Sequence, residues 1–478
     1  MFEKFGLFIN GTWRQAAGGA SASVFSPVTE QPLGAAPQAA MEDTEAALAA
    51  AENGFAAWRR TSAFTRADAL HRIADEMIAR AEEAARMISS ETGKPLAQAQ
   101  REWGLSVDQF RWYAEEARRI YGRIVESRVP GGRFEIHLEP VGIVAAFTAW
   151  NFPAALIARK VAPALAAGCA VVVRPSGQTP GTAMVMVDCI RAGGLPDGTV
   201  NLVVGPTGNT YAPIMASKAV RKVSLTGSTR VGQQMIRDAA DTMKKVSMEL
   251  GGNAPCIIYD DADLEAALDV CVPTKFANCG QVCVTPDRFY VHESRHDAFV
   301  EGFVKRAGKI KLGDGLDESV GMGPLINAGR LKEIEATVES AVNAGAKIAT
   351  GGQRPAEFNS GHFFEPTVLI DVTDDMKAMA EENFGPIAAI APFSSDDEAI
   401  ERANATDMGL AAYAFTGSPA RARRTVEELK SGMVGINSFA LAACEAPFGG
   451  TKFSGMGREG GAEGIGDYLD VKLSQNVF

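Results

Sequence analysis

The sequence predicts an α/β protein built around a doubly wound parallel sheet. Short apolar or β-branched runs recur in the middle of the 478-residue chain, separated by helix-like segments of roughly 10 to 18 residues. The runs cover 142–147, 170–173, 200–204, 222–226 and 246–250. The alternation restarts after Gly251-Gly252 and continues to about residue 436, so we expect a second α/β unit beyond a glycine hinge. A chain of this length is expected to form two or three domains.

The amino-terminal region predicts a hairpin followed by a helical layer. Residues 7–14 are predicted to form two short strands around Asn10-Gly11, a pair that tolerates the positive φ values of a type I′ turn. From about residue 43 to residue 121 apolar side chains recur three and four positions apart, with breaks near 61–62 and at 93–95. We expect these helices to cover another layer.

Residues 134–139 alternate apolar and polar side chains. A half-exposed strand has this pattern because its side chains point in turn to opposite faces of the sheet. We interpret the segment as a strand that could lie at a sheet edge and pair in an oligomer.

The composition is typical of a soluble globular protein. Hydrophobic residues make up 46% and charged residues 22% of the chain, which has a net charge of −11 and a pI near 5.2. No long Lys/Arg block offsets the acidic surface, which argues against nucleic-acid binding. The sequence has neither a signal-peptide pattern nor an apolar run of about 18 residues. We therefore expect a cytoplasmic protein that acts on a small molecule, without a nucleic-acid or membrane partner.

The cysteine pattern predicts reduced thiols and no metal site. There are seven cysteines, an odd number, and five scattered histidines, none of them near Cys279 or Cys283. A zinc site or a Cys-His pair is thus poorly supported. Cys283 lies among small and polar residues in segment 278–286, and we interpret it as a catalytic thiol. A lone cysteine is more often a small core residue, which is how we interpret Cys279, with a redox role as the alternative.

Two polar residues follow or end apolar strands and could assist a thiol. Asn151 comes just after a buried-type strand, where its amide could donate to a developing oxyanion, although capping the helix that opens at Pro153 is the simpler interpretation. Glu249 lies in an apolar strand. If the Glu249 carboxylate is buried, its pKa is raised and it suits a general base. An exposed Glu249 at the end of the strand is an equally good interpretation.

Two further segments could bind a cofactor at the carboxyl ends of strands. Segment 174–180 begins with Arg174 followed by small residues, which could receive a ribose or phosphate, or form an ordinary surface loop. Segment 226–232 is a glycine-rich turn into a helix, whose amides could face a pyrophosphate. The segment matches neither the G-x-G-x-x-G nor the P-loop pattern, so an ordinary turn without a ligand is an equally good interpretation.

Six motifs in order resemble the aldehyde dehydrogenase superfamily over nearly the whole chain. They are Trp150-Asn151-Phe152-Pro153, Gly227-Ser228-Thr229, Glu249-Leu250-Gly251-Gly252, Gly280-Gln281-Val282-Cys283, Glu382-Asn383-Phe384-Gly385-Pro386 and Pro447-Phe448-Gly449-Gly450. Segments 152–160, 446–452 and 457–469 are similar to the succinic-semialdehyde and α-ketoglutaric-semialdehyde dehydrogenase branch.

The resemblance implies a domain organisation and an assembly. A Rossmann-type NAD(P)-binding domain would cover 1–120 and 141–250, an α/β catalytic domain 251–445, and a small β oligomerisation element 121–140 and 458–478. A homodimer or homotetramer is implied.

It also implies a mechanism. The Cys283 thiolate would attack the aldehyde carbon, and the Asn151 amide and the Cys283 main-chain N–H would stabilise the oxyanion. After hydride transfer to NAD or NADP, Glu249 would activate the water that hydrolyses the thioester. The implied cofactor residues are Phe147, Trp150, Arg174, Ser176, Gly177, Gly227, Ser228, Leu250, Gly251, Glu382 and Phe384. The implied substrate residues are Phe152, Arg159, Ala277, Val282, Val284, Ala442 and Phe448.

The chain departs from the family pattern at two places. Arg174 stands where most members have Lys beside the adenine ribose, and Gly177 where NAD-preferring members have Glu. Because a carboxylate that would repel a 2′-phosphate is absent, we predict that NADP is accepted. Ala277 and Ala442 stand where the semialdehyde branch has an Arg and a Ser that help to hold the distal carboxylate, while Arg159 is kept. We therefore predict a roomier site for a bulkier or less acidic aldehyde.

Three alternatives stay open at this point. The protein could oxidise aliphatic or aromatic aldehydes without a carboxylate, or pass the acyl group to CoA instead of water. A non-catalytic dinucleotide-binding protein could share the fold, but it would not need Cys283, Glu249 and Asn151 together. The presence of Glu249 favours hydrolysis over acyl transfer.

Overall fold

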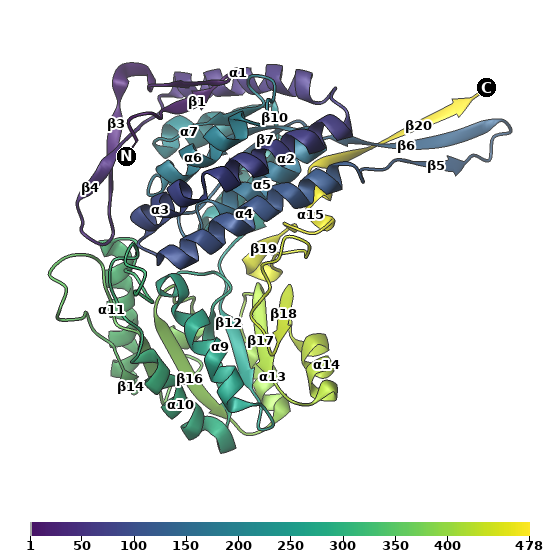
Figure 1. Ribbon diagram of the computed structural model, residues 1–478. Coiled ribbons are helices and arrows are strands. Elements are labelled where there is room, and N and C mark those ends of the chain that lie inside the picture. Colours follow the sequence, from purple (N-terminus) through teal and green to yellow (C-terminus); the bar gives the residue numbers. More distant parts are fainter. Residues whose placement is uncertain (1) are drawn as a thin grey trace.

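The computed structural model describes residues 2–478 and shows two α/β units with a three-stranded arm projecting from one side (Figure 1). Each unit has its own hydrophobic core. The carboxyl terminus lies at the tip of the arm (Figure 1). Within residues 2–478, no helix combines the length and the apolar character needed to cross a membrane.

An eight-stranded sheet forms the first unit, in the order β19-β11-β10-β7-β8-β9-β1-β2. Its parallel strands are β7 (Ile143–Phe147), β8 (Ala170–Arg174), β9 (Val200–Leu202), β10 (Val220–Thr226) and β11 (Lys245–Glu249). These are the five runs expected from the sequence, and the predicted doubly wound sheet is confirmed. The antiparallel hairpin of β1 (Leu7–Ile9) and β2 (Thr12–Arg14) extends one edge, turning at Asn10 and Gly11 with φ values of 52° and 78°.

The first unit has an amino-terminal helical layer and a set of crossover helices. The amino-terminal layer consists of α1 (Met41–Trp58), α2 (Ala63–Ala79), α3 (Ala81–Thr92) and α4 (Leu96–Ala117), and the crossover helices are α5 (Ala155–Ala167), α6 (Pro180–Arg191), α7 (Thr207–Ala216) and α8 (Thr229–Ala240). The two expected helix breaks are present, and an additional break at Arg80 separates α2 from α3. Helix α4 packs along α2 and α5, which brings the amino-terminal layer next to the crossover helices.

A seven-stranded sheet forms the second unit, in the order β14-β15-β16-β13-β12-β17-β18. Its strands are β12 (Ala254–Ile258), β13 (Pro286–His292), β14 (Lys347–Thr350), β15 (Thr367–Ile370), β16 (Ile387–Phe393), β17 (Ala411–Phe415) and β18 (Met433–Ile436), and only β14 is antiparallel. Its helices are α9 (Leu264–Phe276), α10 (Glu293–Ala307), α11 (Ala328–Asn343), α12 (Lys377–Ala380), α13 (Asp396–Asn404) and α14 (Pro419–Glu428). The chain passes from β11 to β12 through Gly251-Gly252.

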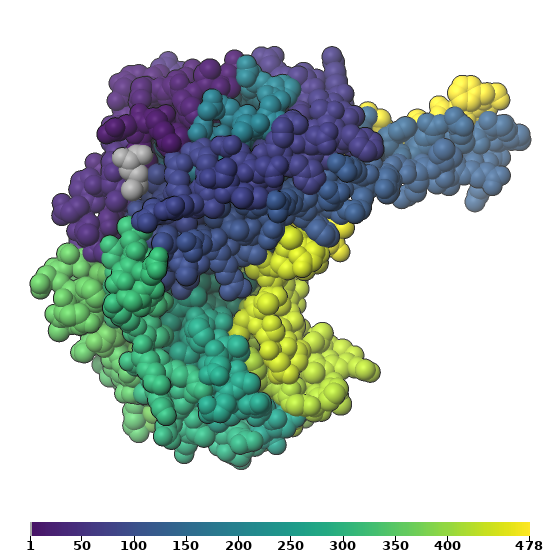
Figure 2. All heavy atoms as spheres, viewed as in Figure 1, coloured from purple at the N-terminus to yellow at the C-terminus, as the bar shows by residue number. Residues whose placement is uncertain are grey.

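The arm is a separate sheet in the order β20-β6-β5. It consists of β5 (Arg123–Glu126), β6 (Gly132–Pro140) and β20 (Leu469–Val477), which follows the short helix α15 (Glu463–Gly466). The prediction that 134–139 forms an edge is wrong, because β6 pairs with β5 on one side and with β20 along its whole length on the other. Strands β5 and β20 are the edges. Figure 2 shows the arm standing clear of the body, with a hollow beneath it.

The two units meet along the side opposite the arm. The hairpin of β3 (Ser21–Phe25) and β4 (Pro32–Pro37) lies there, and the Pro27 carbonyl accepts a hydrogen bond from the His362 amide at 3.1 Å. The Leu96 amide at the start of α4 donates to the Gly315 carbonyl of the second unit at 2.8 Å. Short 3-10 turns occur at η1 (Ala17–Gly19), η2 (Ala277–Gly280) and η3 (Lys452–Ser454), the last followed by β19 (Gly455–Met456).

Candidate active site

Cys283 lies in the loop between η2 and β13, where it lines an internal cavity. The pKa of its thiol is raised to about 12, chiefly by burial and further by the negative charges of Glu382 and Glu249, while Arg159 opposes the shift. The thiolate is the nucleophilic form of cysteine. This thiol therefore needs a base before it can attack a substrate at neutral pH.

The segment before Cys283 adopts a conformation that side chains usually avoid. Asn278, Cys279 and Gly280 have successive φ values of 48°, 57° and 71°. A Cβ on Gly280 would lie 2.1 Å from the carbonyl oxygen of Gly385, so only glycine fits. Cys279 is buried in the core of the second unit, and burial raises its thiol pKa, which suits an unreactive packing residue. Strain of this kind is concentrated where a loop must present a functional group.

Asn151 follows β7 and its side chain is buried. The side-chain Nδ2 donates to the Gln281 carbonyl at 3.1 Å, in the segment that leads to Cys283. The N-cap position of α5 is Ala154, and the Asn151 side-chain oxygen accepts no hydrogen bond among the described residues, so the simpler interpretation of Asn151 as a helix cap is wrong. Its main-chain carbonyl accepts hydrogen bonds from Lys94 Nζ at 2.7 Å and Asn278 Nδ2 at 3.1 Å. The second N–H of the Asn151 amide can serve an oxyanion.

A buried ion pair supports this arrangement. Lys94 Nζ lies 2.6 Å from Glu102 Oε2, and the other carboxylate oxygen accepts from the main-chain N–H groups of Ala154 at 2.8 Å and Ala155 at 3.3 Å. These are the first amides of α5, which lack partners within the helix. The pair links the α3–α4 connection to Asn151. Sequence reasoning missed it, because a lysine at a helix break gives no sign of burial.

Glu249 ends β11 and is buried, which excludes an exposed strand end. Neither carboxylate oxygen has a hydrogen-bond partner among residues 2–478. Burial raises the pKa of Glu249 well above its usual range, and the nearby charge of Glu459 raises it further. It lines the same cavity as Cys283. A carboxyl group in this environment binds a proton readily once it has been ionised.

Lys160 and Glu459 form a second buried ion pair beside Glu249. Lys160 Nζ lies 2.5 Å from Glu459 Oε1 and 2.7 Å from Thr226 Oγ1, and both Thr226 and Glu459 line the cavity. Sequence reasoning missed both residues. One signal existed, since Lys160 lies in the apolar helix α5 and a lysine buried there requires an anionic partner.

The cavity around Cys283 has a volume of about 110 Å³ and an apolar wall interrupted by a few polar groups. Of the expected substrate residues, it is lined by Phe152, Arg159, Val282, Val284, Ala442 and Phe448. The Arg159 guanidinium lies 4.3 Å from the Phe448 ring centre, and its Nη2 donates to the Ala442 carbonyl at 3.3 Å. Its buried Nη1 has no partner in the described chain. A buried guanidinium N–H group without a partner costs free energy that a hydrogen bond to an anion would offset.

A separate groove of about 520 Å³ lies beyond the carboxyl ends of β7, β8 and β10. Of the expected cofactor residues, Phe147, Arg174, Ser176, Gly227 and Ser228 line it. Ser228 immediately precedes α8, whose first N–H groups form an anion-binding helix terminus. Arg174 Nη2 donates to the Gly205 carbonyl at 3.3 Å. The groove thus combines apolar walls, a helix terminus and a cation, which fits a dinucleotide.

Glu382 lies across the start of α8 from this groove. Its Oε1 accepts from the Gly252 amide at 3.0 Å, and burial raises its pKa to about 8. A Cβ on Gly251 would lie 2.5 Å from Glu382 Oε2, so glycine permits this approach. Phe384 packs edge-on against Trp150, with ring centres 5.6 Å apart.

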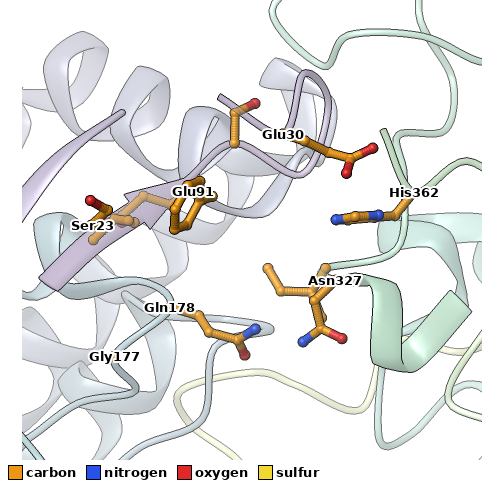
Figure 3. A pocket seen from close by; sticks show the side chains of 11 residues that line it. Ser23, Glu30, Glu91, Gly177, Gln178, Asn327 and His362 are labelled. Atoms are coloured by element: carbon orange, nitrogen blue, oxygen red, sulfur yellow. The ribbon is translucent and has the colours of Figure 1, made fainter. Parts of the chain in front are cut away.

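Six expected cofactor residues do not line the groove, namely Trp150, Gly177, Leu250, Gly251, Glu382 and Phe384. Gly177 lines a different cavity between the two units, together with Gln178 and His362 (Figure 3). Leu250 lines the Cys283 cavity instead of the cofactor groove, and Ala277 is not among the described residues that line either. Residues 2–478 contain no group of three His, Cys, Asp or Glu side chains placed to hold a metal ion.

Comparisons with known proteins agree with this geometry. The model of the aldehyde dehydrogenase family matches residues 13–474. The chain is 44% identical to the 3-sulfolactaldehyde dehydrogenase of Pseudomonas putida, over 97% of this chain and 95% of that protein. It is 41% identical to the NADP(+)-dependent succinate-semialdehyde dehydrogenase GabD of Escherichia coli strain K12, over 97% and 96%. The crystal structure of a succinate-semialdehyde dehydrogenase from Burkholderia pseudomallei superimposes with a TM-score of 0.97 at 41% identity, covering 99% of this chain and 98% of that chain. The chain belongs to the aldehyde dehydrogenase family.

Proposed function

We propose that this NAD- or NADP-dependent aldehyde dehydrogenase oxidises a short aldehyde that carries an acidic group. The observation that carries the proposal is the cavity in which Arg159 presents an unpaired donor alongside Cys283 and Glu249. A guanidinium in an apolar pocket binds carboxylate, sulfonate or phosphate groups through charge-assisted hydrogen bonds. The relatives named above act on aldehydes whose names include such acids.

The proposed reaction begins at the thiol. The Cys283 thiol gives up its proton to solvent, and the thiolate sulfur forms a bond to the aldehyde carbon. The resulting oxyanion is stabilised by the Asn151 amide and the Cys283 main-chain N–H, and losing one such donor typically lowers the rate by about 10²–10³. A nicotinamide cofactor bound in the groove lined by Arg174 and Ser228 would supply the acceptor for the hydride that leaves this carbon. Glu249, having released its proton, then deprotonates the water that displaces the thiol and frees the acid.

The acidic group of the aldehyde is the part of the proposal that kinetics can test directly. The test is a comparison of kcat/KM for succinic semialdehyde, pentanal and benzaldehyde. We expect the acid to be preferred at least tenfold and Arg159→Ala to abolish the preference. A micromolar KM for succinic semialdehyde that survives Arg159→Ala would contradict the proposal.

For the cofactor, we propose that residues 1–120 and 141–250 form the binding domain and that NADP is accepted. Arg174 in the groove supplies a cation, and Arg230 and Arg237 line the same groove. Arg174→Gln removes this cation from the groove, and the variant should lose activity with NADP and keep activity with NAD. A wild-type kcat/KM ratio above about 100 in favour of NAD would refute NADP acceptance.

Acyl transfer to CoA is the competing outcome for the thioester. Glu249 in the cavity favours hydrolysis, because a carboxylate of raised pKa suits a general base for water. Product analysis with and without CoA distinguishes the two. We expect the free acid as the product in both cases.

We also propose that the arm mediates a homodimer or homotetramer. Ile124, Val471 and Leu473 on its strands are exposed apolar residues. Sedimentation velocity of the wild type and of Val471→Asp tests this. A wild-type monomer would refute the assembly.

A further inference from the structure

Arg230 lies where the cofactor groove meets a second, larger space. The groove has a volume of about 520 Å³, and across the start of α8 lies a cleft of about 850 Å³ that contains Glu382. Among the described residues, only Ser228 and Arg230 line both the groove and the cleft. A molecule that occupied both spaces would therefore pass these two residues.

The cleft leads to the reaction site. Glu382 accepts a hydrogen bond from the Gly252 amide at 3.0 Å, and a Cβ on Gly252 would lie 2.5 Å from the Cys283 carbonyl oxygen. Gly252 thus lies between the cleft and the segment that carries the thiol. On the proposed function, the nicotinamide must lie beside Cys283, while the groove beyond β7, β8 and β10 takes the rest of the dinucleotide. The pyrophosphate that joins the two halves then lies between the two spaces.

The charges around the cleft make a cation necessary for an anion to bind there. Arg230 is the one cationic residue that lines the cleft within residues 2–478. Its side chain is exposed and takes part in none of the ion pairs of the described chain. Four acidic residues line the same cleft, namely Asp374, Glu381, Glu382 and Asp407. A pyrophosphate would be repelled by ionised carboxylates unless the charge of Arg230 offset them.

The position of Arg230 within α8 also favours a bound anion. Ser228 is the N-cap of α8, so Arg230 is the second residue of the helix. A cation in the first turn lies at the positive end of the helix dipole, which is unfavourable, and no acidic residue in this turn compensates. A phosphate at the helix terminus would remove the conflict, because it attracts both the free N–H groups and the guanidinium.

We propose that Arg230 binds the pyrophosphate of the cofactor at the junction of the groove and the cleft. The pyrophosphate is common to NAD and NADP, whereas the 2′-phosphate that Arg174 is expected to bind occurs only in NADP. The two arginines therefore have separable effects. Arg230 sets the affinity for both cofactors, and Arg174 sets the choice between them.

The test measures dissociation constants, by fluorescence titration for NADH and NADPH and by competition for two fragments. The fragments are adenosine 5′-diphosphate, which has a pyrophosphate, and adenosine 2′-phosphate, which has none. Arg230→Gln should raise the dissociation constants of NADH, NADPH and adenosine 5′-diphosphate by a similar factor of about tenfold, the value of one charge-assisted hydrogen bond. It should leave adenosine 2′-phosphate unchanged.

Arg221→Gln is the matched control, because it removes the same charge from the amino end of β10 and Arg221 lines neither space. Exposed charges that are distant from a ligand are largely screened, so all four dissociation constants should stay within about twofold. Arg230→Lys keeps the charge without the forked guanidinium, and its constants should lie between those of the wild type and Arg230→Gln. The effect of Arg230→Gln should also shrink in about 0.5 M salt.

Thermal unfolding supplies a second readout. Without cofactor, Arg230→Gln should unfold at the wild-type Tm, which shows that the variant is folded. Adding NADH should raise its Tm less than that of the wild type, because a ligand that binds more weakly stabilises the folded state less. A lower Tm without cofactor, together with unchanged NADH affinity, would mean that Arg230 holds the two units together and would overturn the proposal.

Two other results would overturn it. One is a loss of affinity confined to NADPH and adenosine 2′-phosphate, which would assign Arg230 to the 2′-phosphate. The other is an equal loss of affinity in Arg221→Gln, which would reflect the overall charge of the unit. A wild-type enzyme that bound neither NADH nor NADPH would refute the proposed cofactor itself, so the two failures are distinguishable.

Discussion

Replacing Lys94 with methionine should lower both stability and catalysis, because Lys94 holds the main chain of Asn151. The variant removes a buried ion pair of 2.6 Å with Glu102 and a hydrogen bond of 2.7 Å to the Asn151 carbonyl. Breaking a buried pair leaves an uncompensated charge and costs about 3–5 kcal/mol. Glu102 keeps two main-chain N–H donors, so the lower end, about 3 kcal/mol, is expected.

The effect on catalysis follows from the loosened oxyanion donor. Complete loss of such a donor lowers kcat by about 10²–10³. Asn151 keeps its hydrogen bond from Asn278, so we expect a displaced donor and a decrease in kcat of about tenfold. The assays are urea unfolding followed by fluorescence, and steady-state kinetics under conditions in which the enzyme is fully folded.

The control is Lys222→Met, which removes another buried lysine from the first unit. Lys222 lies near the amino end of β10, away from the cavity at its carboxyl end, and contacts Ser247 and Asp467. This variant should be less stable but retain kcat within about twofold. The double variant Lys94→Met with Glu102→Gln should recover part of the stability and none of the kcat. A Lys94→Met enzyme with wild-type kcat would refute the positioning role.

Three further predictions test the reaction site. Glu249→Gln should release one equivalent of reduced cofactor in a burst and then stall as the acyl-enzyme, as seen by stopped-flow absorbance; steady turnover at the wild-type rate would contradict the role of Glu249. Because the pKa of Cys283 is raised to about 12, its alkylation by iodoacetamide should accelerate steadily as pH rises from 7 to 10, and Glu249→Gln should shift this profile to lower pH by removing a like charge. Gly280→Ala, which places a Cβ 2.1 Å from a carbonyl oxygen, should abolish activity or solubility, and a soluble, fully active variant would show that the loop can relax.

The parallel sheets could be predicted, and the residues proposed to react could be picked out, because their signals are local. Strand runs, a thiol among small residues, and a carboxylate in an apolar strand can each be recognised within a few positions. Helix α4 shows the limit. The spacing of its apolar residues predicts a helix, but the placement of Leu105 and Gln109 in the lining of the Cys283 cavity depends on how α4 packs against α5, more than 40 residues later.

The same limit explains the wrong edge assignment of segment 134–139. Its alternating apolar and polar residues correctly predict a strand, whereas its place in the sheet is decided by pairing with residues 469–477 at the far end of the chain.

The two buried lysines near the site show a further limit of prediction from sequence. Lys160 stands in an apolar helix and could have been suspected, while Lys94 lies beside Gly93 and Pro95 in a segment that looks like an exposed turn.

The chain passes between the two units twice, and the two connecting segments lie side by side. The first crossing follows Glu249 and the second precedes β19, where Leu250 N–H donates to the Ser454 carbonyl at 3.0 Å and β19 pairs with β11. On the opposite side the units are joined only by non-covalent contacts around the cavity of Figure 3. Any separation of the two units would therefore be a hinge rotation about the side that carries the two crossings. Glu249 lies at this hinge, so it would move least as the space between the units widened.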